Sequence, residues 1–278
     1  MSRPGARHLA LLLMALMVVA CGADETTANR AAGTFRPARP GVLRVATAQV
    51  PAPGFWQGTV ANPTGGFEWG LAKAFASRFG LALVEIVEVP FEDLISGRLA
   101  GADMALSQLT FSEGRDRVLD FSTPYLPGKP AILTRAGARV NDMETAQAQR
   151  WSVRRRSTLE RFLNDKVRPT RPVQAVDTRQ ESLDALTNGN VDAVLLDLPV
   201  ATAIASTSGG RLEVAAQFPS DDNLAAALPD HSSNKDAVDS AVRALATDGT
   251  LRTLADRWLH VALTGGLAED IPVIQPPS

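Results

Sequence analysis

From Gly41 onward, short β-rich runs alternate with helical patterns, and this alternation is the strongest constraint on the fold. It predicts βαβ units and mostly parallel sheets, because parallel neighbours need a crossover between them. Strands are expected at residues 43–48, 82–87, 103–106, 130–134, 151–154, 173–176, 193–196, 212–216 and 224–228. The fold class is therefore α/β.

Apolar residues recur at helical spacing between several of these runs. Phe67, Leu71 and Phe75 give one apolar face that begins after two glycines. Near the end, 238–245 and 251–258 repeat the pattern, and Gly249 separates them into two helices. About 235 residues of this kind could form one large sheet or two α/β lobes, and periodicity alone does not decide between them.

The first twenty residues have the character of an export signal rather than of a folded element. Arg3 and Arg7 supply a positive start, and an apolar run over 9–20 follows. A membrane span needs about 20 apolar residues, so this run is too short to span and fits the apolar region of a signal peptide. Residues 1–20 are expected to be removed.

Cys21 is the only cysteine of the 278 residues, and it follows Val18-Val19-Ala20 directly. Small residues before such a cysteine resemble the lipobox of bacterial lipoproteins, in which the cysteine is lipidated and becomes the new N-terminus. The alternative is an ordinary secretory signal with an incidental cysteine. Residues 21–40 are small, polar and proline-containing, which is typical of a flexible linker.

Composition agrees with an exported domain that folds without crosslinks. A single cysteine excludes an internal disulfide, and 45% hydrophobic residues suffice for a core. Loss of Arg3 and Arg7 leaves 26 basic against 30 acidic residues, a net charge of −4. This mild charge argues against nucleic acid or anionic lipid as the main partner. With no second long apolar run, the expected location is the outer face of the cytoplasmic membrane, held by the lipid.

Four segments, in order along the chain, carry a family resemblance. Residues 66–74 resemble a GFDVDLAKA-like helix start, and 103–125 resemble a DAIISGMTITPER-like turn followed by DFSDPY. Residues 189–197 resemble GRVDAVLLD, and 246–258 resemble a KADGTYDKIYEKW-like ending. The chain thus resembles the solute-binding proteins of polar amino-acid ABC transporters, which have the type II periplasmic-binding-protein fold.

The resemblance implies two lobes joined by two crossovers, with lobe one at 41–133 plus 223–278 and lobe two at 134–222. The ligand would lie in the cleft, and the lobes would close over it by a hinge motion. The implied function is capture of an amino acid, polar or acidic, and its delivery to an ABC permease. The protein is expected to act as a monomer.

Arg115 is the predicted partner of the ligand carboxylate. A guanidinium grips both oxygens of a carboxylate at once. Arg115 is expected in a short helix after a strand end, where open α/β sheets place ligands, and it falls on the arginine of the family's TPER-like motif. From spacing alone, a solvated surface arginine would be the better interpretation.

Three hydroxyl residues are candidates for ligand contact. Thr110 and Ser157 each precede a glutamate by three residues, so both also read as capping boxes. The resemblance places Thr110 at a ligand-contacting position, and Ser157 and Thr158 on a GTT-like turn whose last threonine holds the carboxylate. Capping and ligand contact remain compatible roles.

Asp197 follows the apolar run 193–196 and precedes Leu198-Pro199. A carboxylate at the mouth of a buried strand is costly unless it is paired. In the family this aspartate takes the ligand's ammonium. The alternative is a helix N-cap, since proline is common in the first turn.

Two further features depart from the family pattern. Phe55 and Trp56 follow a turn where the family stacks an aromatic ring on the ligand, and either ring could equally be core. Arginines occupy 154–156, where the family's turn has a glycine. Such a run is usually solvated; the sharper hypothesis is that one arginine reaches the cleft and favours an acidic or strongly polar ligand.

A second function class, a periplasmic dehydratase of prephenate-like or arogenate-like acids, is compatible with the same scaffold. Such an enzyme needs an acid or base beyond the binding pair, and only Glu68 and Glu181 are candidates. The three histidines are scattered, and no GxSxG, HExxH or Walker A motif occurs. Neither a metal nor a cofactor is expected.

Overall fold

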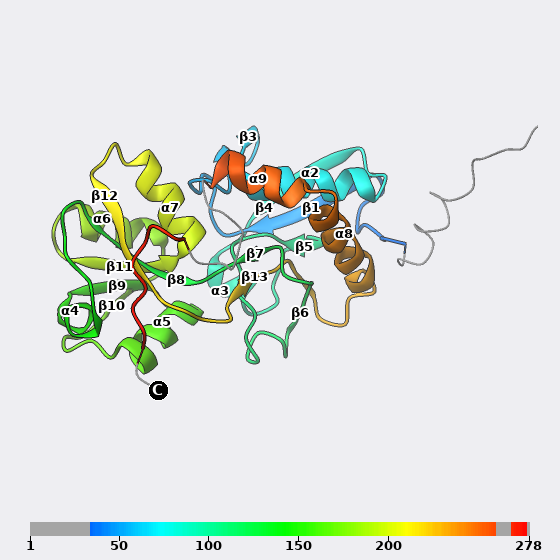
Figure 1. The fold of residues 1–278 in the computed structure, drawn as a ribbon. Coiled ribbons are helices and arrows are strands. Elements are labelled where there is room, and N and C mark those ends of the chain that lie inside the picture. Colours follow the sequence, from blue (N-terminus) through cyan, green and yellow to red (C-terminus); the bar gives the residue numbers. More distant parts are fainter. Residues whose placement is uncertain (1–33, 260–267, 277–278) are drawn as a thin grey trace, which may run out of the picture.

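The computed structural model describes residues 34–259 and 268–276, and these form two α/β lobes side by side (Figure 1). The predicted signal peptide and Cys21 lie outside the described residues. Within the part that is described, no helix has both the length and the apolar character needed to cross a bilayer.

The first lobe is built on a five-stranded sheet in the order β4-β1-β5-β14-β6. Its helices cover the sheet, with α2, α8 and α9 packed together (Figure 1). Leu71 and Phe75 of α2 are fully buried, as the apolar spacing predicts. The elements of this lobe are β1(Val42–Thr47), β2(Gln57–Gly58), β3(Pro63–Gly65), α2(Phe67–Arg78), β4(Leu83–Glu88), α3(Phe91–Leu94), β5(Met104–Ala105), β6(Leu119–Phe121), β14(Ala227–Pro229), α8(Lys235–Thr247) and α9(Thr250–Trp258).

The second lobe has a sheet in the order β10-β9-β11-β8-β12, with its own core around Trp151 and Leu195. Its elements are β8(Pro130–Arg135), α4(Met143–Ala148), β9(Trp151–Arg154), α5(Thr158–Phe162), the π-helical turn η1(Leu163–Val167), β10(Gln174–Val176), α6(Arg179–Thr187), β11(Ala193–Asp197), α7(Leu198–Thr207) and β12(Leu212–Gln217).

The chain crosses between the lobes through a small antiparallel pair, β7(Leu126–Pro127) with β13(Asn223–Leu224). The predicted strand 224–228 is thus two strands, one in the crossover and one in the first sheet. Two pairings in each main sheet are parallel and two antiparallel, so the sheets are more evenly mixed than expected. The antiparallel pairings involve β8, β12 and β14, which adjoin the crossovers.

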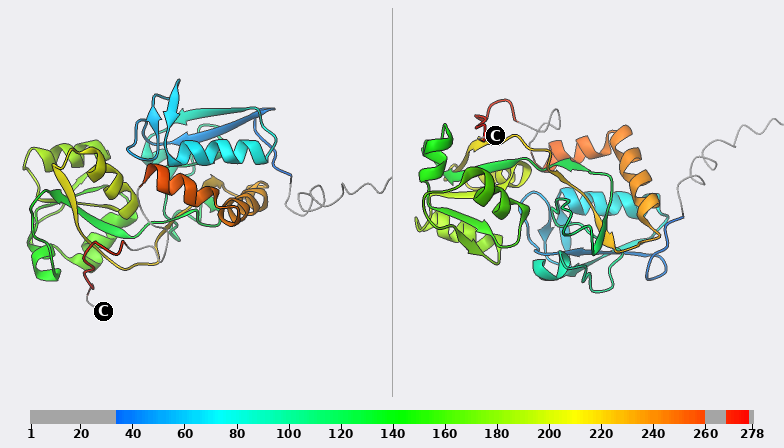
Figure 2. Two further views of the ribbon diagram at one scale, coloured as in Figure 1. Left: turned by 45° about the horizontal axis from the view of Figure 1, so that its top comes forward. Right: turned by 90° about the horizontal axis from the view of Figure 1, so that it is seen from below.

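The structure shifts the expected lobe boundaries. β8 belongs wholly to the second sheet, so that lobe begins at Pro130 and not at 134. The segment 268–276 was expected with the first lobe, yet it lies along the second (Figure 2). There Gln217 of β12 donates to Pro272 and accepts from Ile274 through its backbone, and Ile274 joins the second core. Its apolar side chain finds burial there.

The described end of the predicted linker, residues 34–40, is packed against the first lobe. The Phe35 ring stacks on Phe79 with 4.1 Å between centroids. Asn234 exchanges two hydrogen bonds with the backbone of Arg36. Because Phe35 supplies an apolar ring to bury, this part of 21–40 is folded and not a flexible linker.

Candidate functional site

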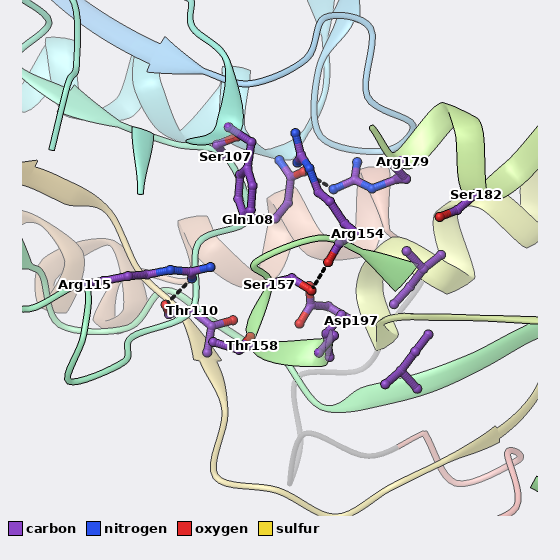
Figure 3. A pocket seen from close by; sticks show the side chains of 14 residues that line it. Ser107, Gln108, Thr110, Arg115, Arg154, Ser157, Thr158, Arg179, Ser182 and Asp197 are labelled. Carbon is purple, nitrogen blue, oxygen red and sulfur yellow. Dashed lines mark hydrogen bonds between the residues drawn. The ribbon is translucent and has the colours of Figure 1, made fainter. Parts of the chain in front are cut away.

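A pocket lies between the lobes and is partly open to solvent. Its walls come from the loop after β5 in the first lobe and from the ends of β9 and β11 in the second. These are carboxyl ends of strands, the position where open α/β sheets bind ligands. Figure 3 shows the polar side chains of both lobes converging on this space.

Arg115 enters the pocket from the first lobe and is 7% exposed. Its Nη1 donates to the carbonyl of Thr110 at 2.7 Å, and its Nη2 lies 3.4 Å from the carbonyl of Arg156 in the second lobe. Burial lowers the pKa of Arg115 to about 10, so the guanidinium remains charged at neutral pH. The surrounding segment forms turns and not the expected short helix, so the capping box at Thr110 does not form.

Asp197 ends β11 and occupies the N-cap position of α7, but its side chain makes no capping hydrogen bond. Its Oδ1 is buried and has no hydrogen-bond partner among the described residues. Burial raises the pKa of Asp197 to about 7, against the opposing effect of Arg179 and Arg115. The carboxylate therefore has unused capacity to accept a hydrogen bond from a cation in the pocket.

The hydroxyls of the pocket divide into two kinds. Ser157 Oγ accepts from the backbone of Glu160 at 3.0 Å and donates to the carbonyl of Arg154 at 2.6 Å, so it caps α5 as predicted. The hydroxyls of Thr110 and Thr158 make no hydrogen bond within the described part of the chain, and both line the pocket. These two remain available to a ligand.

Replacing Thr158 with valine should weaken ligand binding about two- to tenfold, because one hydrogen bond contributes about 0.5–1.5 kcal/mol. Calorimetric titration measures this change in affinity. Unchanged affinity in Thr158→Val would remove Thr158 from the site.

Replacing Ser157 with alanine should instead lower the free energy of unfolding by about 1 kcal/mol, because the cap of α5 is lost. Denaturant unfolding measures this change in stability.

Phe55 and Trp56 do not line the pocket, contrary to one of the interpretations left open above. Both are fully buried in the first lobe. Trp56 donates from Nε1 to Glu68 at 2.7 Å, and the Phe55 ring packs edge-on against Phe67. The aromatic ring of the pocket is Phe91.

The arginine run divides between cleft and surface. Arg154 lines the pocket, and its guanidinium stacks 3.8 Å from the centroid of the Phe91 ring. Arg155 pairs with Asp177 and Arg156 with Glu92, both at exposed positions. Arg156 has a φ of 58°, which explains why the family's turn favours glycine here.

Sequence patterns do not indicate four polar residues of the pocket: Ser107, Gln108, Arg179 and Ser182. Arg179 is the first residue of α6, and the capping box of Thr178 and Glu181 marks that helix start in the sequence. That signal locates Arg179 on a helix but not in the cleft. For Gln108, which has a φ of 49°, no local signal exists.

The candidate catalytic glutamates have other roles. Glu68 is fully buried behind the pocket wall and accepts from Tyr125 Oη at 2.6 Å and from the backbone of Gln108 at 2.8 Å. Burial raises its pKa. Glu181 closes the capping box of α6. Neither lines the pocket.

Two α/β lobes with a charged, partly enclosed cleft between them are the architecture of the type II periplasmic-binding-protein fold. Residues 43–261 match the model of the bacterial extracellular solute-binding proteins, family 3. The chain belongs to this family. Both the predicted family and the predicted two-lobed fold are confirmed.

Individual relatives agree with this assignment. The L-cystine-binding protein TcyJ of Escherichia coli K12 is 27% identical over 266 residues, which cover 92% of this chain and 94% of that protein. A solved amino acid ABC transporter substrate-binding protein from Streptococcus pneumoniae, bound to L-arginine, has a TM-score of 0.70 at 26% identity. That match covers 81% of this chain and 96% of the solved one.

A third comparison bears on the enzyme alternative. An ancestral amino-acid-binding protein described as a precursor of cyclohexadienyl dehydratase has a TM-score of 0.67 at 24% identity, covering 79% of this chain and 95% of that one. This likeness shows a shared fold and nothing about activity.

Proposed function

We propose that this protein captures an amino acid, polar or acidic, between its lobes and delivers it to an ABC permease. One observation carries the proposal: two opposite, buried charges, Arg115 and Asp197, face one interlobe pocket without forming an ion pair with each other. A zwitterionic amino acid has a carboxylate for the first and an ammonium for the second. Two relatives are named for the amino acids that they bind, one for L-cystine and one for arginine. These names support an amino acid as the ligand class.

Contacts between the lobes support binding with closure. Arg179 Nη2 donates to Gln108 Oε1 across the cleft at 2.9 Å, and Arg156 lies 3.4 Å from Glu92. Arg154 stacks on Phe91 of the opposite lobe. Because a ligand touches both lobes, its binding would add to these contacts and favour the closed form.

A thermal-shift screen of the L-amino acids against the purified protein tests the proposal. A ligand that binds only the folded state raises the melting temperature, by an amount set by its concentration relative to Kd. We expect at least one amino acid to stabilise the protein. No shift with any zwitterionic amino acid at millimolar concentration would refute the proposed ligand class.

The dehydratase alternative is not favoured, since both candidate glutamates serve the framework. Turnover of prephenate or arogenate by the purified protein would reverse this view. We also propose a monomer that is lipid-anchored through Cys21 on the outer face of the cytoplasmic membrane. Incorporation of labelled fatty acid, abolished in Cys21→Ala, tests the anchor.

A further inference from the structure

The charges that line the pocket do not balance. Three arginines, Arg115, Arg154 and Arg179, face it together with one carboxylate, Asp197. The amino-acid group of a ligand is neutral as a whole and would engage Arg115 and Asp197. Two guanidiniums are then left over, and neither has a carboxylate within 4 Å among the described residues.

Arg179 carries the clearest sign of a missing partner. It is 7% exposed, and its Nη2 donates to Gln108 Oε1 at 2.9 Å. Its Nη1 is buried and has no acceptor within the described chain. A buried N–H of a charged group is costly unless an acceptor reaches it. Nothing in the wall of the pocket supplies that acceptor.

Gln108 holds Arg179 in this arrangement. Its backbone N–H and its side-chain Nε2 both donate to the buried Glu68. With both donors directed at Glu68, the remaining side-chain oxygen faces Arg179 across the cleft. The strained φ of 49° at Gln108 is consistent with a backbone held for this purpose. Figure 3 shows Arg179 reaching from α6 toward Gln108.

Arg154 adds a second positive charge to the same region. Its guanidinium lies over the Phe91 ring, and its Nε donates to the carbonyl of Asp177 at 3.3 Å. Burial, then repulsion by Arg179 and Arg115, lowers the pKa of Arg154 to about 9. An anion between Arg154 and Arg179 would relieve this repulsion.

We infer that Arg154 and Arg179 form a second anion subsite, so that the ligand is an amino acid with two carboxylates. The inference rests on the proposed function and names its substrate class. It also separates this protein from the relative solved with bound L-arginine, because a cationic side chain would meet two guanidiniums there. The second carboxylate could belong to an acidic side chain, which adds a net negative charge. It could also be the far carboxylate of cystine, whose second ammonium would then have to lie away from both arginines.

The sharpest test compares L-glutamate with L-glutamine by calorimetric titration, since the two differ in charge and hardly in shape. L-aspartate and L-cystine serve as further diacids, and L-arginine as the opposite charge. We expect at least one diacid to bind ten times or more tightly than both glutamine and arginine. Preference for cystine over glutamate and aspartate would place the second carboxylate at the far end of a longer ligand.

Two variants test whether the preference for a diacid over glutamine depends on Arg154 and Arg179. Arg154→Gln and Arg179→Gln should each reduce the diacid-to-glutamine ratio at least fivefold. Arg155→Gln, which removes an exposed neighbour paired with Asp177, should leave the ratio unchanged. Arg154→Gln keeps the test valid should the buried Arg179→Gln fail to fold.

Glutamine or arginine binding as tightly as every diacid would overturn the subsite and leave amino-acid capture intact. A diacid preference that survives both variants would likewise overturn it. Failure of all amino acids to bind would instead reject the proposed function itself.

Discussion

An Arg115→Met protein should bind its amino acid at least about thirtyfold more weakly than the wild type. The guanidinium is buried and oriented by the carbonyl of Thr110, so it is preset to grip a carboxylate with both arms. Removing one partner of a buried, hydrogen-bonded charge pair costs about 2–5 kcal/mol or more. Calorimetric titration with the best ligand of the amino-acid screen measures the loss.

Two further variants sharpen this result. Arg117→Met removes the same charge from an exposed position two residues away and should leave the affinity unchanged. Arg115→Lys keeps the positive charge but loses the planar guanidinium that can donate two parallel hydrogen bonds. Its ligand affinity should lie between those of Arg115→Met and Arg117→Met. Equal affinities of Arg115→Met and the wild type would contradict the assignment of Arg115 to the ligand carboxylate.

Ligand affinity should fall by up to tenfold per pH unit as the pH drops below about 7, because the unliganded Asp197 has a pKa of about 7. Its carboxylate must be ionised to accept the ligand's ammonium, and the bound ammonium in turn lowers its pKa. Binding below pH 7 therefore releases a proton from Asp197. Titrations between pH 5 and 8, in buffers of different ionisation enthalpy, measure both the affinity and the proton release.

The same shift affects the stability of the unliganded protein with a definite sign. Between pH 4 and about 7, folded Asp197 keeps a proton that the unfolded chain has already lost. The folded state thus binds more protons in this window, and the contribution of Asp197 to stability falls as pH rises through it. At pH 8, Asp197→Asn should therefore raise the free energy of unfolding by about 1–3 kcal/mol.

The Asp197→Asn variant should also lose the pH dependence of binding, together with most of the affinity. Asp256→Asn, an exposed change on α9, provides the control and should alter neither property. If Asp197→Asn bound amino acids as the wild type does, the ammonium would have another partner. Stability lost rather than gained at pH 8 would mean that the carboxylate is satisfied within the protein.

Local patterns predicted the elements of the fold well. The run 151–154 is β9 with the expected bounds, and Gly249, with a φ of 81°, separates α8 from α9 as anticipated. Periods of two and of three to four residues arise from short-range geometry, so they are legible in sequence. The division of 224–228 into β13 and β14 cannot be read from the local sequence. It depends on pairing with β7 and β6, which lie about a hundred residues away along the chain.

The site divides in the same way. Arg115, Thr110, Ser157, Thr158 and Asp197 were expected at the ligand and do line one pocket. Each lies in a short sequence motif that can be read locally. For Phe55 and Trp56 the sequence left core and cleft open, because an apolar ring next to a turn looks the same in both, and the structure places both rings in the core.

The alternating α/β order, the family and the pair of charges suited to an amino acid can all be read from the residues and their motifs. That Arg154 and Arg179 share the cleft, and that 268–276 lies on the second lobe, follows from the three-dimensional arrangement alone. Gln108 and Arg179 are 71 residues apart, and their contact exists only because one lobe closes on the other. A buried guanidinium without a partner is costly, so the two additional arginines favour an anionic ligand. Their burial depends on contacts between distant residues, which no local pattern encodes.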